Sequence, residues 1–111
     1  MSVLRIVVQK FGGSSLANAS IRNEALQRVW EAVELGLTPV VVVSAMGRGG
    51  DPYATDTLLS LLYEVNPEAD VVNTDLLLSC GEIISAAIFA VGLQKLGLPA
   101  VALTGWQSGI Y

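Results

Sequence analysis

Three segments rich in glycine and hydroxyl residues hold the groups that could do chemistry in this sequence. They are KFGGSS at residues 10–15, SAMGRGG at 44–50 and TGWQSG at 104–109. Glycine lets backbone N–H groups approach a ligand closely, and successive N–H groups can form a nest for an anion. Lys10 adds a full positive charge. The residue types therefore favour a site for phosphate groups, although any one of these segments could be only a turn.

Each of these segments directly follows a predicted β-strand. The strands are expected at residues 3–9, 39–45 and 99–104. Four consecutive valines in the second strand indicate burial on both faces, as in a parallel sheet. Ligands of an open parallel sheet lie beyond the carboxyl ends of its strands, so the three glycine-rich segments should gather at one edge. A three-stranded sheet also leaves an edge that invites pairing with another chain, and we expect a homo-oligomer.

Three helices are predicted to cover this sheet, at residues 18–35, 55–64 and 71–96. In the first of them an apolar residue recurs at every fourth position, namely at Ile21, Ala25, Val29 and Val33. Asn18 or Ser20 could cap its start, and Gly36 fits the left-handed position after its end. In the third helix, Gly81 is a candidate for a bend. Strand, helix and strand in this order form a right-handed βαβ unit, so the fold class is α/β with a mainly parallel sheet.

Composition excludes several classes of function. With 52% hydrophobic and 14% charged residues, the 111-residue chain should bury one domain core. Histidine is absent, which excludes a Ser-His-Asp triad, a Cys-His pair and a histidine metal site. A net charge of −4 without a basic run argues against nucleic-acid or membrane partners. Cys80 cannot form an internal disulfide, and the N-terminus does not have the pattern of a signal peptide, so we expect a cytoplasmic protein.

Residues 76–93 carry a single charged side chain, that of Glu82. By length and composition this segment could span a membrane. Its polar residues, and the lack of a cationic flank or an aromatic belt, favour the apolar central helix of a layered domain instead. Burying an unpaired carboxylate costs several kcal/mol, so Glu82 should have a positive partner, either an arginine or a ligand.

Five segments, taken in order, resemble the N-terminal part of the aspartate kinases of the amino acid kinase family. They are VVQKFGGSSLANA, VVVVSAMG, ATDTLLSLL, LLLSCGEIIS and ALTGWQSGI. The stretch GRGGDPYATDTLL is most similar to the lysine-pathway enzymes of Gram-positive bacteria. The resemblance implies a three-layer αβα fold with a mainly parallel sheet, the amino acid kinase or carbamate kinase-like fold, of which residues 1–111 would be the N-terminal part.

The resemblance also implies a reaction. The γ-phosphoryl group of ATP would pass to the β-carboxylate of L-aspartate and give 4-phospho-L-aspartate, the first step of lysine, threonine and methionine biosynthesis. Magnesium would enter with ATP, held mainly through the phosphates. No metal-ligand cluster is expected in the protein itself.

Residues in the first two glycine-rich segments match positions that hold the nucleotide in the family. Lys10 matches the lysine that contacts the phosphates and would neutralise the group being transferred. Backbone N–H groups for the phosphate oxygens would come from Phe11, Gly12, Gly13 and Ser14. Ser44 and Gly47 would lie beside the phosphates.

Two further residues match family positions that hold the amino acid. Thr55 would help to hold aspartate, and Glu82 would contact its ammonium group. For three nearby residues, the residue type alone predicts a structural role. Asp51 reads as a turn residue rather than a metal ligand, Asp56 as a first-turn helix residue, and Cys80 as a small buried hydrophobe.

The family's second catalytic lysine, its further substrate contacts, its adenine pocket and its regulatory ACT domains have no match in these residues. We therefore expect little or no turnover from the 111-residue chain alone. Two alternatives stay open. The chain could be a non-catalytic half-domain that binds nucleotide or phosphate, or the parent could be another amino acid kinase, such as acetylglutamate kinase.

Overall fold

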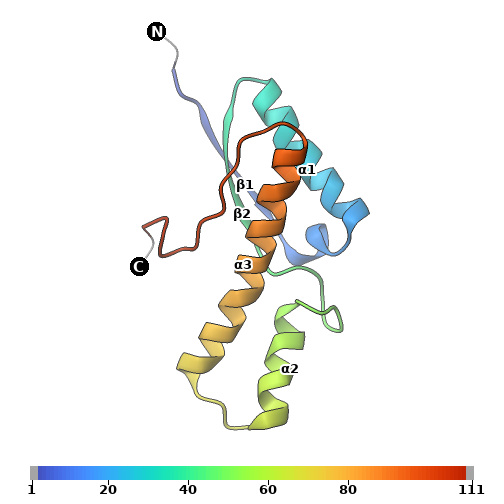
Figure 1. Cartoon of the computed structure of the whole chain (residues 1–111), viewed down its shortest axis with the longest axis vertical. Coiled ribbons are helices and arrows are strands. Elements are labelled where there is room, and N and C mark those ends of the chain that lie inside the picture. Colours follow the sequence, from blue (N-terminus) through green and yellow to red (C-terminus); the bar gives the residue numbers. More distant parts are fainter. Residues whose placement is uncertain (1–2, 110–111) are drawn as a thin grey trace.

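The computed structural model of the protein describes residues 3–109. Its elements, in chain order, are β1 (Ile6–Phe11), the short 3-10 helix η1 (Gly13–Leu16), α1 (Ala19–Glu34), β2 (Thr38–Val43), α2 (Thr55–Val65) and α3 (Val71–Lys95). Figure 1 shows that α2 and the first half of α3 extend beyond the sheet as a helical hairpin. The fold class is α/β, as predicted.

The first half of the chain is a βαβ unit built on local signals. Strands β1 and β2 pair in parallel, with Ile6 opposite Thr38 and Phe11 opposite Val43. The Asn18 side chain accepts a hydrogen bond of 3.0 Å from the backbone N–H of Ile21 and so caps α1. Gly36 follows α1 with a φ of +82°, the left-handed conformation that ends many helices. These features confirm the predicted start and end of the first helix.

The core lies between one face of the sheet and the helices α1 and α3. Helix α3 runs without interruption through Gly81 and buries one stripe, namely Gly81, Ser85, Phe89, Ala90 and Leu93. The ring of Phe89 stacks on that of Phe11 in β1, with centroids 5.5 Å apart. By length and hydropathy α3 could also cross a membrane. In this fold its buried stripe packs against the sheet and α1, as the core helix of a layered domain does.

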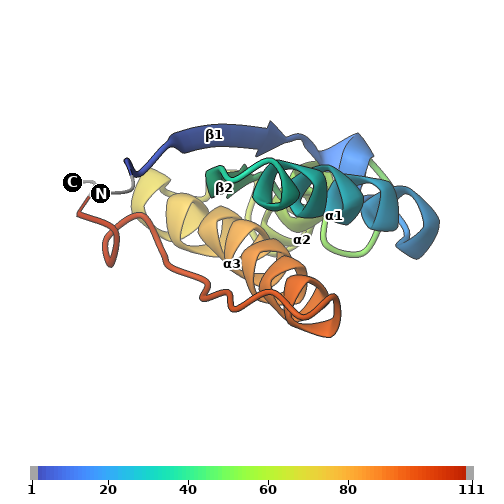
Figure 2. The same cartoon turned by 90° about the horizontal axis from the view of Figure 1, so that it is seen from above.

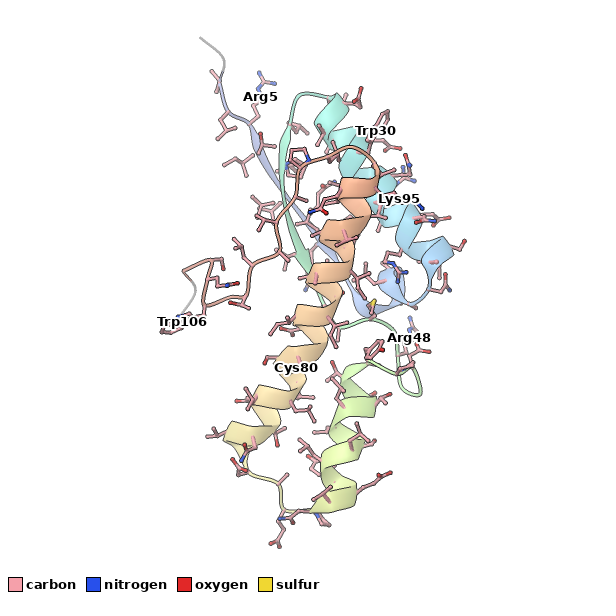
Figure 3. The ribbon with its side chains drawn as sticks, in the orientation of Figure 1. Arg5, Trp30, Arg48, Cys80, Lys95 and Trp106 are labelled. Atoms are coloured by element: carbon pink, nitrogen blue, oxygen red, sulfur yellow. The ribbon has the colours of Figure 1, made fainter. Side chains whose placement is uncertain are left out.

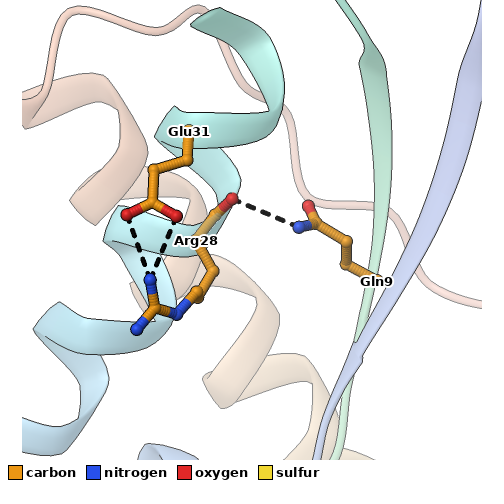
Figure 4. Close-up of polar contacts among 3 residues, drawn as sticks. All are labelled: Gln9, Arg28 and Glu31. Carbon is orange, nitrogen blue, oxygen red and sulfur yellow. Dashed lines mark hydrogen bonds and ion pairs between the residues drawn. The ribbon is translucent and has the colours of Figure 1, made fainter. Parts of the chain in front are cut away.

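Polar contacts cap the start of α3 and join α1 to the sheet. The Asp70 carboxylate caps α3, accepting hydrogen bonds from the backbone N–H of Asn73 at 3.0 Å and from its side-chain amide at 2.8 Å. Gln9 of β1 donates to the backbone carbonyl of Arg28 in α1 at 3.3 Å (Figure 4). Arg28 in turn pairs with Glu31 at 3.0 Å on the surface. A pair this exposed contributes about 0–1 kcal/mol, so packing holds α1 in place.

The second face of the sheet is open, contrary to the prediction of burial on both faces. Exposure alternates along both strands, and four of the six outward side chains are apolar: Ile6 is 60% exposed, Val8 66%, Val40 48% and Val42 47%. Figure 2 shows the helices on one side of β1 and no helix or strand above it in that view. The described residues therefore form two layers of the expected three. Burial of the valines on the open face of the sheet would require the third layer.

The predicted strand at 99–104 does not form. Leu98 and Ala100 pack against the core cluster, and the Ala100 carbonyl accepts a hydrogen bond of 3.1 Å from the Gln94 side chain. The chain beyond forms no helix or strand within the described residues. A strand needs a neighbouring strand for its backbone groups, and the described sheet, which consists of β1 and β2, does not pair with this segment.

Candidate functional site

The first two glycine-rich segments are joined directly at the carboxyl edge of the sheet. The N–H of Ser44 donates to the carbonyl of Phe11 at 3.1 Å, and the N–H of Gly47 donates to the carbonyl of Gly13 at 2.8 Å. A Cβ atom on Gly13 would lie 2.6 Å from the Gly47 carbonyl oxygen and 2.7 Å from that of Ala45. Only glycine allows so close an approach, so these two segments form one unit, as the sheet argument predicts.

The third segment does not join them. Residues 104–109 close into a turn of their own, in which the Gln107 side chain accepts from the N–H of Thr104 at 2.9 Å. Figure 3 shows Trp106 and Arg48, which belong to the third and second segments, on opposite sides of the molecule. The prediction that three segments gather at one edge is therefore wrong for the third. It depended on the strand at 99–104, which does not form.

Three adjacent backbone N–H groups at this edge have no hydrogen-bond acceptor among the described residues. These are the amides of Gly12, Gly13 and Ser14. They stand at the start of η1, where helix geometry leaves N–H groups without a partner. The position of a Cβ on Gly12 has no atom within 4 Å, so the approach is open. Adjacent unpaired amides of this kind suit a phosphate group.

Lys10 lies within β1 rather than directly after it, because the strand extends to Phe11. It pairs with Val42, is exposed, and shares the open face of the sheet with Ile6 and Val8. Among the described residues its ammonium group has no hydrogen bond or ion pair. A cation two residues before the free amide of Gly12, and not engaged elsewhere, can turn toward an anion bound there.

Phe11 and Ser44 support the edge through their backbones. The Phe11 ring is part of the core, and its carbonyl is occupied by the N–H of Ser44. Ser44 is half-buried beside the joined segments. Phe11 therefore acts here as an anchor that holds the end of β1 against α3, which is the core position that its residue type also suggests.

Helix α3 brings Glu82 to the same region. A Cβ on Gly81 would lie 3.1 Å from the side chain of Ala45 and 3.1 Å from the backbone carbonyl of Tyr53, so α3 packs on the second segment and on the chain leading into α2. Glu82 is the next residue along α3. Thr55 is the first residue of α2 and is exposed. Both residues therefore sit on elements that contact the second segment.

Two sequence expectations about this region need correction. Glu82 is exposed, and no arginine pairs with it among the described residues, so the argument from a buried carboxylate is wrong for this chain. Cys80 is exposed as well, not a buried hydrophobe. Both errors have one physical source, since α3 is apolar on all sides but only one of its faces is covered here.

Two acidic residues that follow the second segment behave as their sequence context predicts. Asp51 is a turn residue, and its carboxylate accepts a hydrogen bond of 2.8 Å from the N–H of Arg48. Asp56 lies in the first turn of α2. The described residues contain no group of three or more histidine, cysteine, aspartate or glutamate side chains placed to hold a metal ion.

Comparison with known proteins finds matches that cover nearly the whole chain, including the two joined segments. Residues 5–110 match the family model described as the amino acid kinase family. The chain is 52% identical to Aspartokinase 1 of Bacillus subtilis over 106 residues, which are 96% of the chain and 26% of that relative. It is 43% identical to the aspartokinase of Geobacillus stearothermophilus over 105 residues, 95% of the chain and 25% of the relative.

A solved structure agrees with these matches. The crystal structure of aspartate kinase from Synechocystis superposes with a TM-score of 0.80 at 38% identity, over 88% of this chain and 16% of that one. The chain thus spans about a quarter of the length of the curated relatives it matches.

Proposed function

The chain belongs to the amino acid kinase family, and from this premise we propose that it forms the phosphate-binding edge of an ATP-dependent aspartate kinase. The observation that carries the proposal is the junction of Gly13 with Gly47 beside the three free amides of residues 12–14. Identity of 52% and 43% to aspartokinases supports aspartate as the acceptor.

The proposed mechanism uses position and charge more than covalent chemistry, as phosphoryl transfer requires. The amides of Gly12, Gly13 and Ser14 hold phosphate oxygens of ATP. The Lys10 ammonium swings over the edge and neutralises charge on the group being transferred. Ser44 and Gly47 border the same phosphates from the second segment.

The acceptor enters from the side of the two helices. Glu82 binds the ammonium group of L-aspartate, and Thr55 helps to fix the molecule. A β-carboxylate oxygen then attacks the γ-phosphorus, the bond to the bridging oxygen breaks, and ADP leaves with that oxygen. Magnesium would enter with ATP, held mainly through the phosphates, and would neutralise part of their charge. The pathway context proposed for this reaction is lysine, threonine and methionine biosynthesis in the cytoplasm, by a homo-oligomeric enzyme.

Phosphate binding can be tested on the 111-residue chain itself. Lys10→Ala should weaken binding of Mg-ATP, measured by calorimetry, by about 10- to 100-fold, since a hydrogen bond to a charged group is worth about 1.5–3 kcal/mol. Lys95→Ala is the matched control, because Lys95 is an exposed lysine in the last turn of α3. It should change affinity less than about twofold. Equal effects of the two substitutions would remove Lys10 from the phosphate site.

Catalysis needs a second test, because the chain alone is expected to bind without turnover. The matching 106 residues of Aspartokinase 1 of Bacillus subtilis can be replaced by those of this chain. We expect the chimera to form aspartyl hydroxamate from ATP, aspartate and hydroxylamine, and to lose this activity with Glu82→Gln. A chimera that folds and binds ATP but phosphorylates no aspartate would favour the two alternatives, a non-catalytic phosphate-binding half-domain or a kinase for another acceptor such as acetylglutamate.

A further inference from the structure

Asp51 directly follows the second glycine-rich segment, and its side chain holds the end of that segment in a turn. Its carboxylate accepts from the backbone N–H of Arg48 at 2.8 Å, and its own N–H donates to the Arg48 carbonyl at 2.9 Å. Its carbonyl accepts from the N–H of Ala54 at 3.2 Å, just before α2. The side chain and the backbone of Asp51 thus hold both ends of a turn that spans residues 48–54.

The same side chain lies directly beside Gly47. A Cβ atom on Gly47 would overlap Oδ2 of Asp51, and it would lie 2.6 Å from the Cβ atom of Asp51. Gly47 has a φ of +87°, a conformation that other residues rarely adopt. Gly47 is therefore held in an unusual conformation, with the Asp51 carboxylate packed directly against it.

Gly47 is also the residue that reaches the first segment. Its N–H donates to the Gly13 carbonyl at 2.8 Å, and Gly13 stands in the middle of the three free amides. A continuous chain of contacts therefore runs from the Asp51 carboxylate through Gly47 to Gly13. No atom of Asp51 needs to touch a phosphate for this chain to set where the amides point.

We propose that Asp51 is a positioning residue of the phosphate site. This inference rests on the proposed function, since it assigns a role at the same edge of the sheet. Asp51 acts as a hydrogen-bond acceptor that locks Gly47 against Gly13. Its negative charge is not needed for that, and a carboxylate near a phosphate is otherwise unfavourable.

Both an acceptor role and a charge role of Asp51 predict a loss in Asp51→Ala, but only the charge role predicts a loss in Asp51→Asn. Asp51→Asn keeps a side-chain oxygen that can accept from Arg48 and nearly the same shape, so the turn should survive. Asp51→Ala removes both the hydrogen-bond acceptor and the carboxylate that packs against Gly47, so the turn should open. Asp75→Ala is the matched control, because Asp75 is an exposed aspartate of α3 outside this network.

Two readouts on the 111-residue chain test the inference. Amide hydrogen exchange of Gly47, compared with core amides of α1, reports on the contact with Gly13. Calorimetric titration with Mg-ATP reports on the phosphate site. Asp51→Ala should speed exchange at Gly47 and weaken ATP binding by about tenfold each, which is the loss of roughly one such hydrogen bond. Asp51→Asn and Asp75→Ala should keep both values within about threefold of the original chain.

The outcomes separate this inference from the proposed function. Unchanged Gly47 exchange in Asp51→Ala, or equal losses in Asp51→Asn and Asp51→Ala, would overturn the positioning role while ATP binding by the original chain stands. Absence of ATP binding by the original chain would overturn the proposed function, and with it the claim that Asp51 positions a phosphate site. In that case the exchange rates would still decide whether Asp51 holds the two segments together.

Discussion

Replacing each of the two adjacent glycines of the first segment by alanine should give opposite results. Gly12 has a φ of −79° and a ψ of 174°, and a Cβ there would meet no atom within 4 Å. Alanine fits this conformation, and the less flexible unfolded chain should raise the free energy of unfolding by about 0.4–1 kcal/mol. A Cβ on Gly13 would instead lie 2.6 and 2.7 Å from two backbone carbonyl oxygens.

The cost at Gly13 can be worked from these contacts. Relieving an overlap with rigid backbone costs about 1–3 kcal/mol in comparable cases of overpacking. Moving Gly47 away also loses its hydrogen bond to Gly13, which is worth about 0.5–1.5 kcal/mol. After the same gain of about 0.4–1 kcal/mol in the unfolded chain, Gly13→Ala should lower the free energy of unfolding by about 0.5–4 kcal/mol.

Urea unfolding followed by circular dichroism measures both values on the 111-residue chain. The two variants have the same composition, so their denatured states are closely matched, and the difference between them should be about 1.5–4.5 kcal/mol. A Gly13→Ala variant as stable as the original chain, with ATP binding intact, would refute the reasoning. It would mean that the two glycine-rich segments are not in contact.

Two further predictions concern α3. The buried hydroxyl of Ser85 has no hydrogen-bond partner among the described residues, and such a group costs about 1–3 kcal/mol, so Ser85→Ala should leave the urea midpoint unchanged or raise it. Ser79→Ala is the control for the change in helix propensity, and because the Ser79 hydroxyl already donates to the Leu76 carbonyl at 2.7 Å, it should raise the midpoint less than Ser85→Ala does. At the start of the helix, hydrogen bonds from Asn73 hold the pKa of Asp70 below its ordinary value. The stabilisation is therefore complete above the unfolded pKa of about 3.9 and is lost as pH falls through the lower folded pKa. Exchange at the first turn of α3 should rise below that pH in the original chain and show no such step in Asp70→Asn.

The parts of the fold that sequence predicts well are those decided by neighbours along the chain. Asn18 caps α1 because its side chain reaches an amide three residues away. Gly36 and Gly97 follow α1 and α3 with φ values of +82° and +87°, which few other residues accept. The carboxyl edge of two parallel strands brings two glycine-rich segments together for the same kind of reason, since the βαβ connection is short.

The wrong predictions all concern residues whose burial or pairing depends on parts of a protein far away in the sequence. Residue types predict burial for the valines of β2, a paired strand at 99–104 and a positive partner for Glu82. In the described residues the second sheet face is open, the strand has no partner, and α3 is covered on one side. Apolar composition predicts that a surface is suited to be covered, and it does not say which part of a protein covers it.

This division between local and distant contacts bears on function. The contacts that shape the proposed phosphate-binding edge, from Asp51 through Gly47 to Gly13, all lie within residues 13–54. The groups proposed to hold the acceptor, Thr55 and Glu82, stand exposed on elements that only border this edge. Gripping a phosphate should therefore be a property of the βαβ unit and its second segment alone. Selecting and orienting aspartate should depend on contacts to the rest of a kinase domain. Nucleotide affinity in the 111-residue chain without phosphoryl transfer is the behaviour that follows.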